Sequence, residues 1–351
     1  MALLSLRLLI ALIVAQSLCV LLFTHSPSSR DVTAQMLQQF HCVKLRQQFS
    51  NFTSTDRVVL SNFSKELSDF LSCPSKLNET YRELQRTRLQ FCCNATGSVI
   101  LTKRNTDVNQ EIPYDTNEKR TYKIKPELHS MLPEDSPWLP GSLSRCAVVG
   151  SGGILKNSSC GREIDSADFV IRFNLALIND SDVGQKTDLV TVNPSQIRKD
   201  LEQNPDPLLE RVGVYGNAPL VIPAFAYSFC TLPALRVLRV LYPIRAKKPV
   251  FFFSPYYLRS LDRFWKGRGL KEIRLSTGFM LISMALEMCE DVHVYGFWPF
   301  ATNLEGNPVP YHYYDAGTVN RVMHKMPQEF VRLLQLHSQG ALTLHLQPCA
   351  Q

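Results

Sequence analysis

The stretch Cys146-Ala-Val-Val-Gly-Ser-Gly-Gly153 decides how the rest of the chain is interpreted. Its first four residues are apolar, as in a short buried strand, and they run directly into a glycine-rich turn. Such a turn lets the backbone approach a ligand closely and can present amide groups to a phosphate. An ordinary βα turn has the same sequence, so the two interpretations are weighed equally. Leu155 stands where a dinucleotide site needs a further glycine, and the Gly-Lys-Ser/Thr ending of a P-loop is absent.

Alternating strands and helices are predicted after this turn. Further strands are expected at 169–173, 189–192, 220–222, 250–253 and 292–295, and helices at 207–211, 257–266, 278–289 and 327–337. This alternation is typical of an α/β domain around a mostly parallel sheet. Such sheets bind ligands at the carboxyl ends of their strands. The polar segment 102–123 has no clear period and is predicted to be a loop that wraps the surface.

Two polar segments lie where this arrangement would place a ligand. Arg172-Phe-Asn174 ends a predicted strand, so its polar side chains would face the crevice at the edge of the sheet. Ser276-Thr-Gly278 opens a predicted helix, where hydroxyls, free amides and the helix dipole together form an anion pocket. A polar loop and a simple N-cap are the alternatives.

Two histidines in predicted loops are candidates for acid–base chemistry. His312 begins the sequence His-Tyr-Tyr-Asp, and His324 begins His-Lys-Met-Pro-Gln-Glu just before a predicted helix. A loop histidine followed by an acid is a candidate general base with an orienting partner. Surface or capping histidines are the more frequent case.

The N-terminus indicates the compartment. Leu8 to Phe23 is apolar and uncharged, close to the lower limit of about 17 residues for a membrane-spanning helix. A cleaved signal peptide is the alternative, because Ala15-Gln-Ser17 resembles a cleavage site. The apolar run continues past that site, which favours an uncleaved anchor. Arg7 and Arg30 flank the apolar run on either side, so the positive charges do little to indicate which end of it faces the cytosol.

Glycosylation sequons and cysteines predict that the rest of the chain lies in the lumen of the secretory pathway. There are ten cysteines, without a Cys-x-x-Cys pair that would suggest zinc. The hydrophobic fraction of 45% allows a sizeable core, and the net charge of +7 favours acidic partners. A lumenal location excludes nucleic acid as the partner. The sequons begin at Asn51, Asn62, Asn78, Asn94, Asn157 and Asn179.

Four segments together resemble the motifs of the sialyltransferase family in order and spacing. The large motif is 146–194, the small motif 275–297, the third motif 312–315 and the very small motif 324–329. The resemblance covers residues 146–349. His-Tyr-Tyr-Asp and the sequence Gly-Phe-Trp-Pro-Phe at 296–300 resemble the α2,8-linking branch.

The resemblance implies a single-pass type II membrane protein of the Golgi apparatus. We expect a cytosolic tail at 1–7, a signal anchor at 8–23, a lumenal stem at 24–80 and a catalytic domain at 81–351. The domain would have a GT-A-like variant of the Rossmann-type α/β fold, with helices flanking a mostly parallel sheet. The oligomeric state stays open, with a homo-oligomer among the expected arrangements.

The implied reaction is inverting transfer of sialic acid from CMP-sialic acid to the 8-hydroxyl of a sialic acid on a glycoprotein or ganglioside. His324 resembles the base that deprotonates the acceptor, His312 resembles the group that hydrogen-bonds the departing phosphate, and we infer that Glu329 orients the His324 loop. The residues that resemble donor contacts are Gly150, Ser151, Gly152, Gly153, Asn174, Ser276, Thr277, Gly278, Gly296, Phe297 and Trp298.

The sequence departs from the family pattern at two positions. Ser151 stands where relatives more often have Asn, which puts one donor contact in doubt, and Phe173 stands where they often have Cys. Asp180-Ser-Asp182 has the form of a metal motif, but it overlaps a sequon and is expected on an exposed loop. The resemblance implies that no metal or other cofactor is needed. It also implies disulfides that join Cys146 to Cys289 and Cys160 to Cys349, and it assigns no partner to Cys42, Cys73, Cys92, Cys93 or Cys230.

A basic stretch bears on the acceptor. Between Arg236 and Arg274 there are eleven Lys or Arg residues against Asp262 and Glu272, a surplus that could hold a sialylated acceptor. A solvated helix face is the alternative. We expect transfer of one or a few residues and keep polysialylation as an alternative. An α2,3- or α2,6-sialyltransferase acting on galactose and an inactive, lectin-like glycan-binding protein also stay open.

Overall fold

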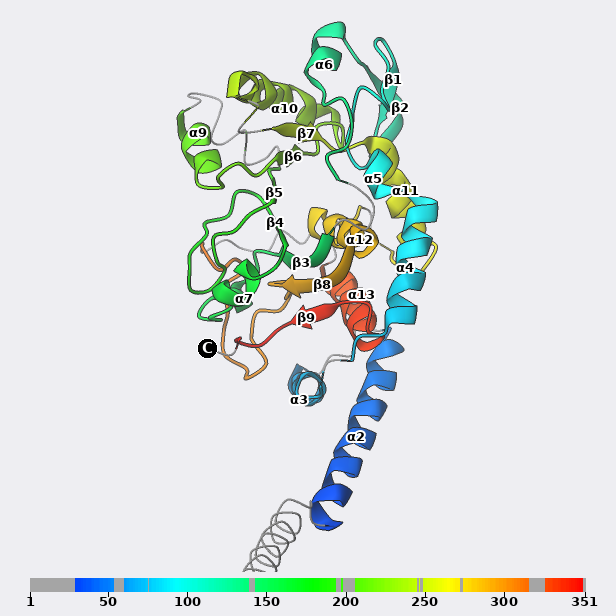
Figure 1. The fold of residues 1–351 in the computed structure, drawn as a ribbon, viewed down its shortest axis with the longest axis vertical. Helices are drawn as coiled ribbons and strands as arrows, with labels where there is room; N and C mark the ends of the chain where they lie inside the picture. The colour runs from blue at the N-terminus through cyan, green and yellow to red at the C-terminus, as the bar shows by residue number, and fades with distance from the viewer. Residues whose placement is uncertain are drawn as a thin grey trace, which may run out of the picture. The chain divides into compact units, whose positions relative to one another are not determined.

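The computed structural model describes residues 29–53, 60–74, 76–138, 143–193, 197, 206–244, 246, 249–271, 274–315 and 326–349 (Figure 1). The chain divides into two compact units, Met1–Gln48 and Phe49–Gln351, and most of helix α2 (Ser29–Ser50) belongs to the first. The expected cytosolic tail and membrane anchor, residues 1–23, lie outside the described residues. No helix within the described ranges has both the length and the apolar character needed to cross a membrane.

A parallel sheet of seven strands forms the centre of the second unit. The strand order is β7-β6-β5-β4-β3-β8-β9, and each neighbouring pair is parallel. The α/β class with a mostly parallel sheet is confirmed, and each strand predicted from the sequence is present. The strands are β3 (Leu143–Val149), β4 (Phe169–Arg172), β5 (Leu189–Thr191), β6 (Leu220–Ile222), β7 (Val250–Phe252), β8 (Cys289–Tyr295) and β9 (Thr343–His345).

Helices connect and cover these strands (Figure 1). The predicted helices are present as α9 (Asp206–Gly213), α11 (Pro255–Lys266), α12 (Thr277–Met288) and α13 (Met326–Ser338). Helix α10 (Ser228–Leu241) follows β6 and had no counterpart in the sequence analysis. Within the described ranges, the remaining helical elements are α3 (Leu60–Leu71), α4 (Glu79–Cys92), α5 (Ala95–Ser98), α6 (Pro126–Met131), α7 (Gly161–Asp165) and the 3-10 turns η1 (Gly153–Leu155) and η2 (Tyr242–Ile244).

The prediction of a loop at 102–123 was wrong for the second half of that segment. It contains an antiparallel hairpin of β1 (Glu111–Tyr114) and β2 (Asn117–Lys123). Ile112 and Tyr114 are buried in a cluster with α10 and the strands β6 and β7, while β2 is almost entirely exposed. Because β2 carries hardly any inward-facing side chain, it lacks the alternation that identifies a strand in a sequence.

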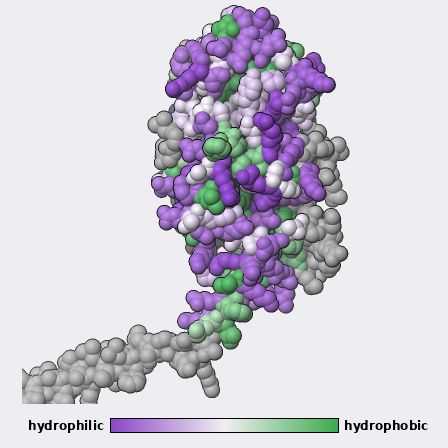
Figure 2. Space-filling view, turned by 90° about the vertical axis from the view of Figure 1, so that its right-hand side faces the viewer, coloured by the Kyte–Doolittle hydropathy of each residue, from purple (hydrophilic) through white to green (hydrophobic). Residues whose placement is uncertain are grey.

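Two hydrophobic clusters of described residues hold the sheet to its surroundings. One joins β5, β6 and β7 to α9, α10 and the hairpin, and the other joins β3 and β4 to α7 through residues such as Val149, Ile164 and Val170. The face shown in Figure 2 is largely hydrophilic over the second unit. The residues of both clusters are buried, so the strand ends that carry the candidate site rest on a packed core.

The structure contains both disulfides that the family resemblance implied. Cys146 in β3 is bonded to Cys289 at the start of β8, and Cys160 is bonded to Cys349 near the C-terminus. These bonds close sequence separations of 143 and 189 residues. A disulfide across a long loop typically contributes about 2–4 kcal/mol by restricting the unfolded chain.

Two cysteines without an expected partner, Cys92 and Cys93, are bonded to each other at the end of α4. Cys230 is a buried thiol on α10. The sequon asparagines 51, 78, 94, 157 and 179 are exposed, as glycan attachment requires.

Candidate active site

The glycine turn after β3 lies beside the end of β8 in the middle of the sheet. The N–H groups of Gly150 and Gly152 donate to the carbonyls of Tyr295 (2.8 Å) and Gly296 (2.9 Å). The N–H of Gly153 donates to the carbonyl of Tyr311 at 3.1 Å. These amides are used within the protein, so the turn does not present them to a phosphate as its sequence alone would allow.

The turn needs glycine because separate backbone segments meet there. A Cβ atom on Gly152 would lie 2.4 Å from the carbonyl oxygen of Gly296, and one on Gly153 would lie 1.8 Å from that of Pro310. Gly152 also forms an antiparallel bridge with His312, and Tyr313 N–H donates to the carbonyl of residue 151 at 3.1 Å. The turn therefore places His312 next to the ends of β3 and β8.

A cavity of about 250 Å³ opens where this turn meets the strand ends, the start of α12 and one side of α13. Its walls include each predicted donor contact except Gly153, together with His312. Gly153 instead packs beneath Pro310. Glu329, which the sequence analysis assigned to orienting the His324 loop, also lines the cavity. The sequence analysis gave no site role to the lining residues Asn193, Pro299, Tyr311, Met326, Phe330 and Leu333.

Two asparagines stand at the ends of the adjacent strands β4 and β5. Asn174 has a left-handed φ of 57°, which asparagine tolerates better than most residues, and its Oδ1 accepts the N–H of Asn193 at 3.0 Å. Asn193 could have been found from the sequence, because it follows a predicted strand directly. Arg172 does not line the cavity; its buried side chain donates to the carbonyl of Lys186 at 3.0 Å and therefore supports the strand end.

Ser276 forms the N-cap of α12. Its Oγ accepts the N–H of Phe279 at 3.1 Å, which satisfies one of the amides that a helix leaves free at its start. Thr277 and Gly278 follow and line the cavity. A Cβ atom on Gly278 would lie 2.5 Å from the ring of Phe297, so glycine lets that ring close the cavity wall.

His312 is held at one nitrogen by a carboxylate. Its Nδ1 lies 2.9 Å from Oδ1 of Asp315, and because a carboxylate only accepts, Nδ1 carries the proton. The imidazole stacks on the Tyr314 ring at 5.1 Å and contacts the Tyr311 ring at 4.4 Å. Burial raises the pKa of both tyrosines, so their hydroxyls stay protonated at neutral pH. Among the residues that the structure describes, no hydrogen bond to the other ring nitrogen of His312 is found.

The comparison of residues 100–341 with known protein families shows which family the chain belongs to. Residues 100–341 match the family model described as glycosyltransferase family 29 (sialyltransferase). The chain belongs to this family of sialyltransferases.

Curated relatives are similar along most of this sialyltransferase. It is 36% identical over 342 residues to alpha-2,8-sialyltransferase 8E of Mus musculus, covering 92% of this chain and 83% of the relative. It is 40% identical over 279 residues to an alpha-N-acetylneuraminide alpha-2,8-sialyltransferase of Bos taurus, covering 78% of each chain. A solved structure titled as a mammalian sialyltransferase aligns with a TM-score of 0.43 at 24% identity, covering 78% of this chain and 87% of that one.

His324, which the motif pattern suggests as the base of this sialyltransferase, lies outside the described residues. Glu329, five positions later, is described and buried at the cavity. It lies at the start of α13, and its carboxylate bonds to Ser276 at the start of α12.

The Asp180-Ser-Asp182 segment does not line the cavity. The carboxylate of Asp182 accepts the backbone N–H groups of Asn157 (3.0 Å) and Ser159 (3.2 Å), so it holds a turn together.

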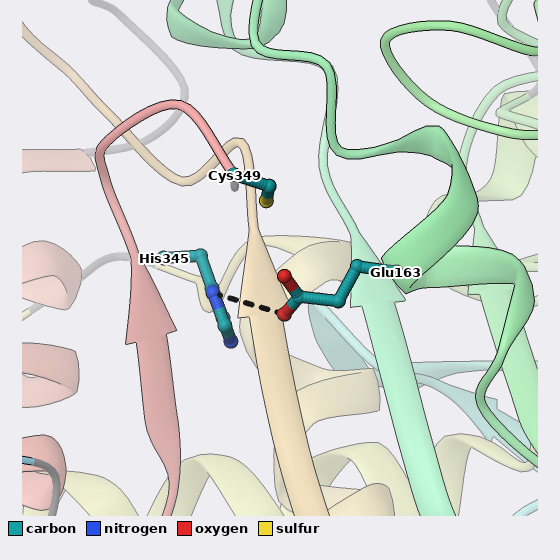
Figure 3. Close-up of side chains that lie close together, drawn as sticks. All are labelled: Glu163, His345 and Cys349. Atoms are coloured by element: carbon teal, nitrogen blue, oxygen red, sulfur yellow. Dashed lines mark ion pairs between the residues drawn. The ribbon is translucent and has the colours of Figure 1, made fainter. Parts of the chain in front are cut away.

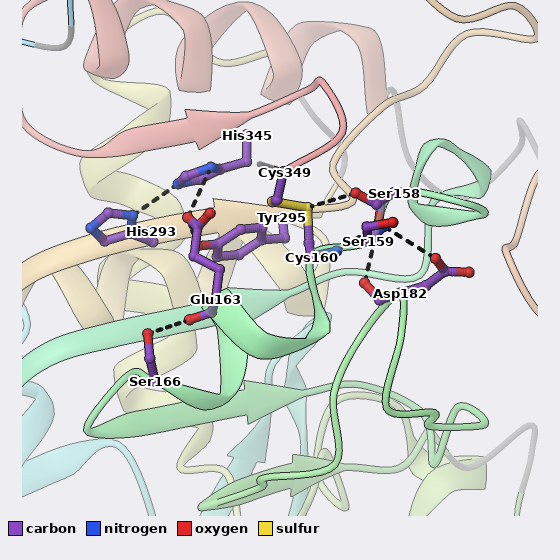
Figure 4. Close-up of a disulfide and its surroundings, with 10 residues drawn as sticks. All are labelled: Ser158, Ser159, Cys160, Glu163, Ser166, Asp182, His293, Tyr295, His345 and Cys349. Carbon is purple, nitrogen blue, oxygen red and sulfur yellow. Dashed lines mark hydrogen bonds and ion pairs between the residues drawn. A yellow bond between two sulfur atoms is a disulfide. The ribbon is translucent and has the colours of Figure 1, made fainter. Parts of the chain in front are cut away.

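A second cluster has the composition of a metal site. Glu163, His345 and Cys349 bring one ligand atom each within 4.8 Å of one another (Figure 3). The sulfur of Cys349, however, is bonded to Cys160 (Figure 4), so it is not a thiolate ligand. The two side chains that are left do not make a metal centre.

The same cluster belongs to a network of partly buried polar side chains along β8 and β9 (Figure 4). His293 Nδ1 lies 2.8 Å from His345 Nε2, and His293 Nε2 lies 2.9 Å from Asp291. Tyr295 donates its hydroxyl to Glu163 at 2.7 Å, and that carboxylate is 3.5 Å from His345 Nδ1. Burial is the main cause that lowers the pKa of His345 to about 3, so its imidazole is neutral in the folded protein.

A larger basic pocket of about 610 Å³ lies between the hairpin, α10 and α11. Its cations include part of the basic stretch noted in the sequence. Three of them pair with acids: Arg259 with Glu118, Lys266 with Asp262 and Arg274 with Asp115. Its other cations are Arg120 and Arg263.

Proposed function

We propose that this sialyltransferase transfers sialic acid from CMP-sialic acid to the 8-hydroxyl of a terminal sialic acid. The observation that carries this proposal is the cavity at the strand ends, where the N-terminus of α12 and the imidazole of His312 face the same space. A helix N-terminus and a histidine are both suited to a phosphate. The α2,8 linkage rests on the names of the relatives and on the sequence around His312.

In this mechanism the bond between the sialic acid and the CMP phosphate breaks as the acceptor oxygen attacks the opposite face of the sugar. Charge builds up on the departing phosphate. The amides at the start of α12 and the imidazole of His312 would stabilise that charge, and Asp315 keeps the imidazole oriented. His324 is proposed, from its motif alone, to take the proton from the acceptor hydroxyl.

We propose the basic pocket as the surface that attracts the sialylated acceptor. A carboxylated sugar is an anion, and the pocket holds more cations than acids. The test is Arg263→Ala, which should raise the KM for a sialylated acceptor several-fold and leave the KM for CMP-sialic acid unchanged. Arg104→Ala is the matched control, because Arg104 is exposed and pairs with Asp135 outside the pocket. Equal acceptor KM values for the two variants would refute this role.

The donor is tested by calorimetric titration of CMP into the disulfide-bonded lumenal part of the chain, and the acceptor by a screen with labelled CMP-sialic acid. We expect CMP to bind and sialylated acceptors to be extended by one or a few residues. His312→Ala should reduce kcat about a hundredfold, while His129→Ala, a histidine on α6 outside the cavity, should not. Failure of CMP to bind, or transfer only to asialo acceptors, would refute the proposal; a long product ladder would indicate polysialylation instead.

The membrane arrangement is also proposed: a Golgi type II protein with a cytosolic tail at 1–7, an anchor at 8–23, a stem at 24–80 and a lumenal catalytic domain at 81–351. It is supported by the family and by the exposed sequons. The buried residues Phe63, Leu67 and Phe70 place helix α3, inside the proposed stem, within the compact second unit. Protease protection and glycosidase sensitivity in Golgi vesicles test the orientation.

A further inference from the structure

Glu329 makes contacts at the cavity that its place in the sequence does not reveal. Its Oε1 accepts the backbone N–H of Ser276 at 2.6 Å, and its Oε2 accepts the hydroxyl of the same serine at 2.5 Å. Only 4% of Glu329 and 5% of Ser276 are exposed, so water does not compete for these bonds. Hydrogen bonds to an ionised carboxylate are among the stronger ones in proteins.

These bonds fix the direction in which α12 begins. The hydroxyl of Ser276 donates to Glu329 and accepts from the N–H of Phe279, so its rotamer is set from both sides. With the donors of Ser276 engaged, the amides that the helix start leaves for a ligand are those of Thr277 and Gly278. Both residues line the cavity.

We propose that Glu329 is a positioning residue for donor binding: it acts through Ser276 to hold the amides of Thr277 and Gly278 in the geometry that grips the donor phosphate. The proposal rests on the donor assignment above. It also couples two chain segments, because Glu329 lies on α13 and Ser276 precedes α12, 53 positions apart. The carboxylate itself does not contact the reacting atoms.

Glu329→Gln tests this role with little change in volume. Glutamine cannot accept both Ser276 donors, since one of its oxygens becomes an amide donor. We expect the KM for CMP-sialic acid and the Kd for CMP to rise about tenfold or more, because displacement of positioned groups by an ångström can cost up to about a hundredfold. The KM for the acceptor should stay within twofold of the wild type.

Glu287→Gln is the matched control. Glu287 is also a buried glutamate with a backbone donor, the N–H of Ala95 at 2.6 Å, but it sits at the far end of α12 and outside the cavity. A purely structural role for Glu329 predicts that Glu329→Gln, like Glu287→Gln, keeps the wild-type KM for CMP-sialic acid. That result would overturn the proposal.

Ser276→Ala tests the same contact from the other side and does not depend on the folding of the Glu329 variant. It removes the hydroxyl and should also raise the donor KM, and combining it with Glu329→Gln should lower kcat/KM by less than the product of the single effects. An unchanged donor KM in Ser276→Ala, or independent effects in the double variant, would refute the coupling. Wild-type protein that does not bind CMP would instead refute the proposed function.

Discussion

Replacement of His345 by glutamine should change how the stability of the protein depends on pH. The pKa of His345 is lowered from 6.5 to about 3 in the fold. A lowered histidine pKa means that the unfolded chain takes up a proton that the folded chain refuses. The stabilising effect is therefore complete above pH 6.5 and is lost as the pH falls towards 3. Between pH 7.5 and 5.5, linkage gives a loss of about 1.4 kcal/mol from this residue.

Glutamine at position 345 keeps a polar group near His293 and Glu163 but cannot titrate. The free energy of unfolding of the variant, relative to the wild type, should therefore improve by about 1.4 kcal/mol between pH 7.5 and 5.5. This corresponds to a relative rise in Tm of about 2 °C for a unit the size of Phe49–Gln351. Denaturant unfolding or calorimetry at both pH values measures it. A wild-type minus variant difference that is the same at both pH values would refute the argument.

Three further outcomes are expected. Burial raises the pKa of Glu287 to about 7, so its effect on stability has the opposite sign to that of His345. Protonation of Glu287 favours the fold, and the free energy of unfolding of the wild type should fall by about 2 kcal/mol as the pH rises from 5.5 to 7.5. Glu287→Gln should remove this loss when unfolding is measured over that range. Joint replacement of Cys160 and Cys349 by serine should lower the Tm by about 3–6 °C in calorimetry, whereas an unchanged Tm would show that this disulfide does not stabilise the fold. Transfer activity should be unaffected by chelator, because Glu329, the one carboxylate among the described lining residues, is engaged by Ser276; loss of activity that manganese restores would show otherwise.

The sheet could be predicted where its strands are buried on both faces. The predicted strands at β3 to β8 are apolar runs bounded by turn residues, and burial of parallel strands produces that pattern. Strand β9 was missed because it has three residues, only one of them buried, so the sequence there has no apolar run. Helix α10 contains Pro233 in its interior, a residue that ordinarily argues against a helix.

The candidate site was predictable as a set of segments but not as a set of contacts. The turn at Gly150, the strand end at Asn174 and the helix start at Ser276 each carry a local signal, and the family resemblance joined them. The bond between Glu329 and Ser276 has no local signal, because it depends on how α13 packs beside α12. The sequence also could not show that the amides of the glycine turn are already hydrogen-bonded, since their acceptors are carbonyls from distant segments.

The strand order has a consequence for biosynthesis. Strand β3 lies between β4, which follows it closely in the chain, and β8, which ends at Tyr295. A nascent chain that has emerged only as far as β7 therefore carries β3 with one unpaired edge, and Cys289, the partner of Cys146, has not yet emerged. Exposed edges of this kind promote wrong pairing and aggregation. Productive folding should thus wait until β8 has emerged, and chaperones would have to shield the open edge until then.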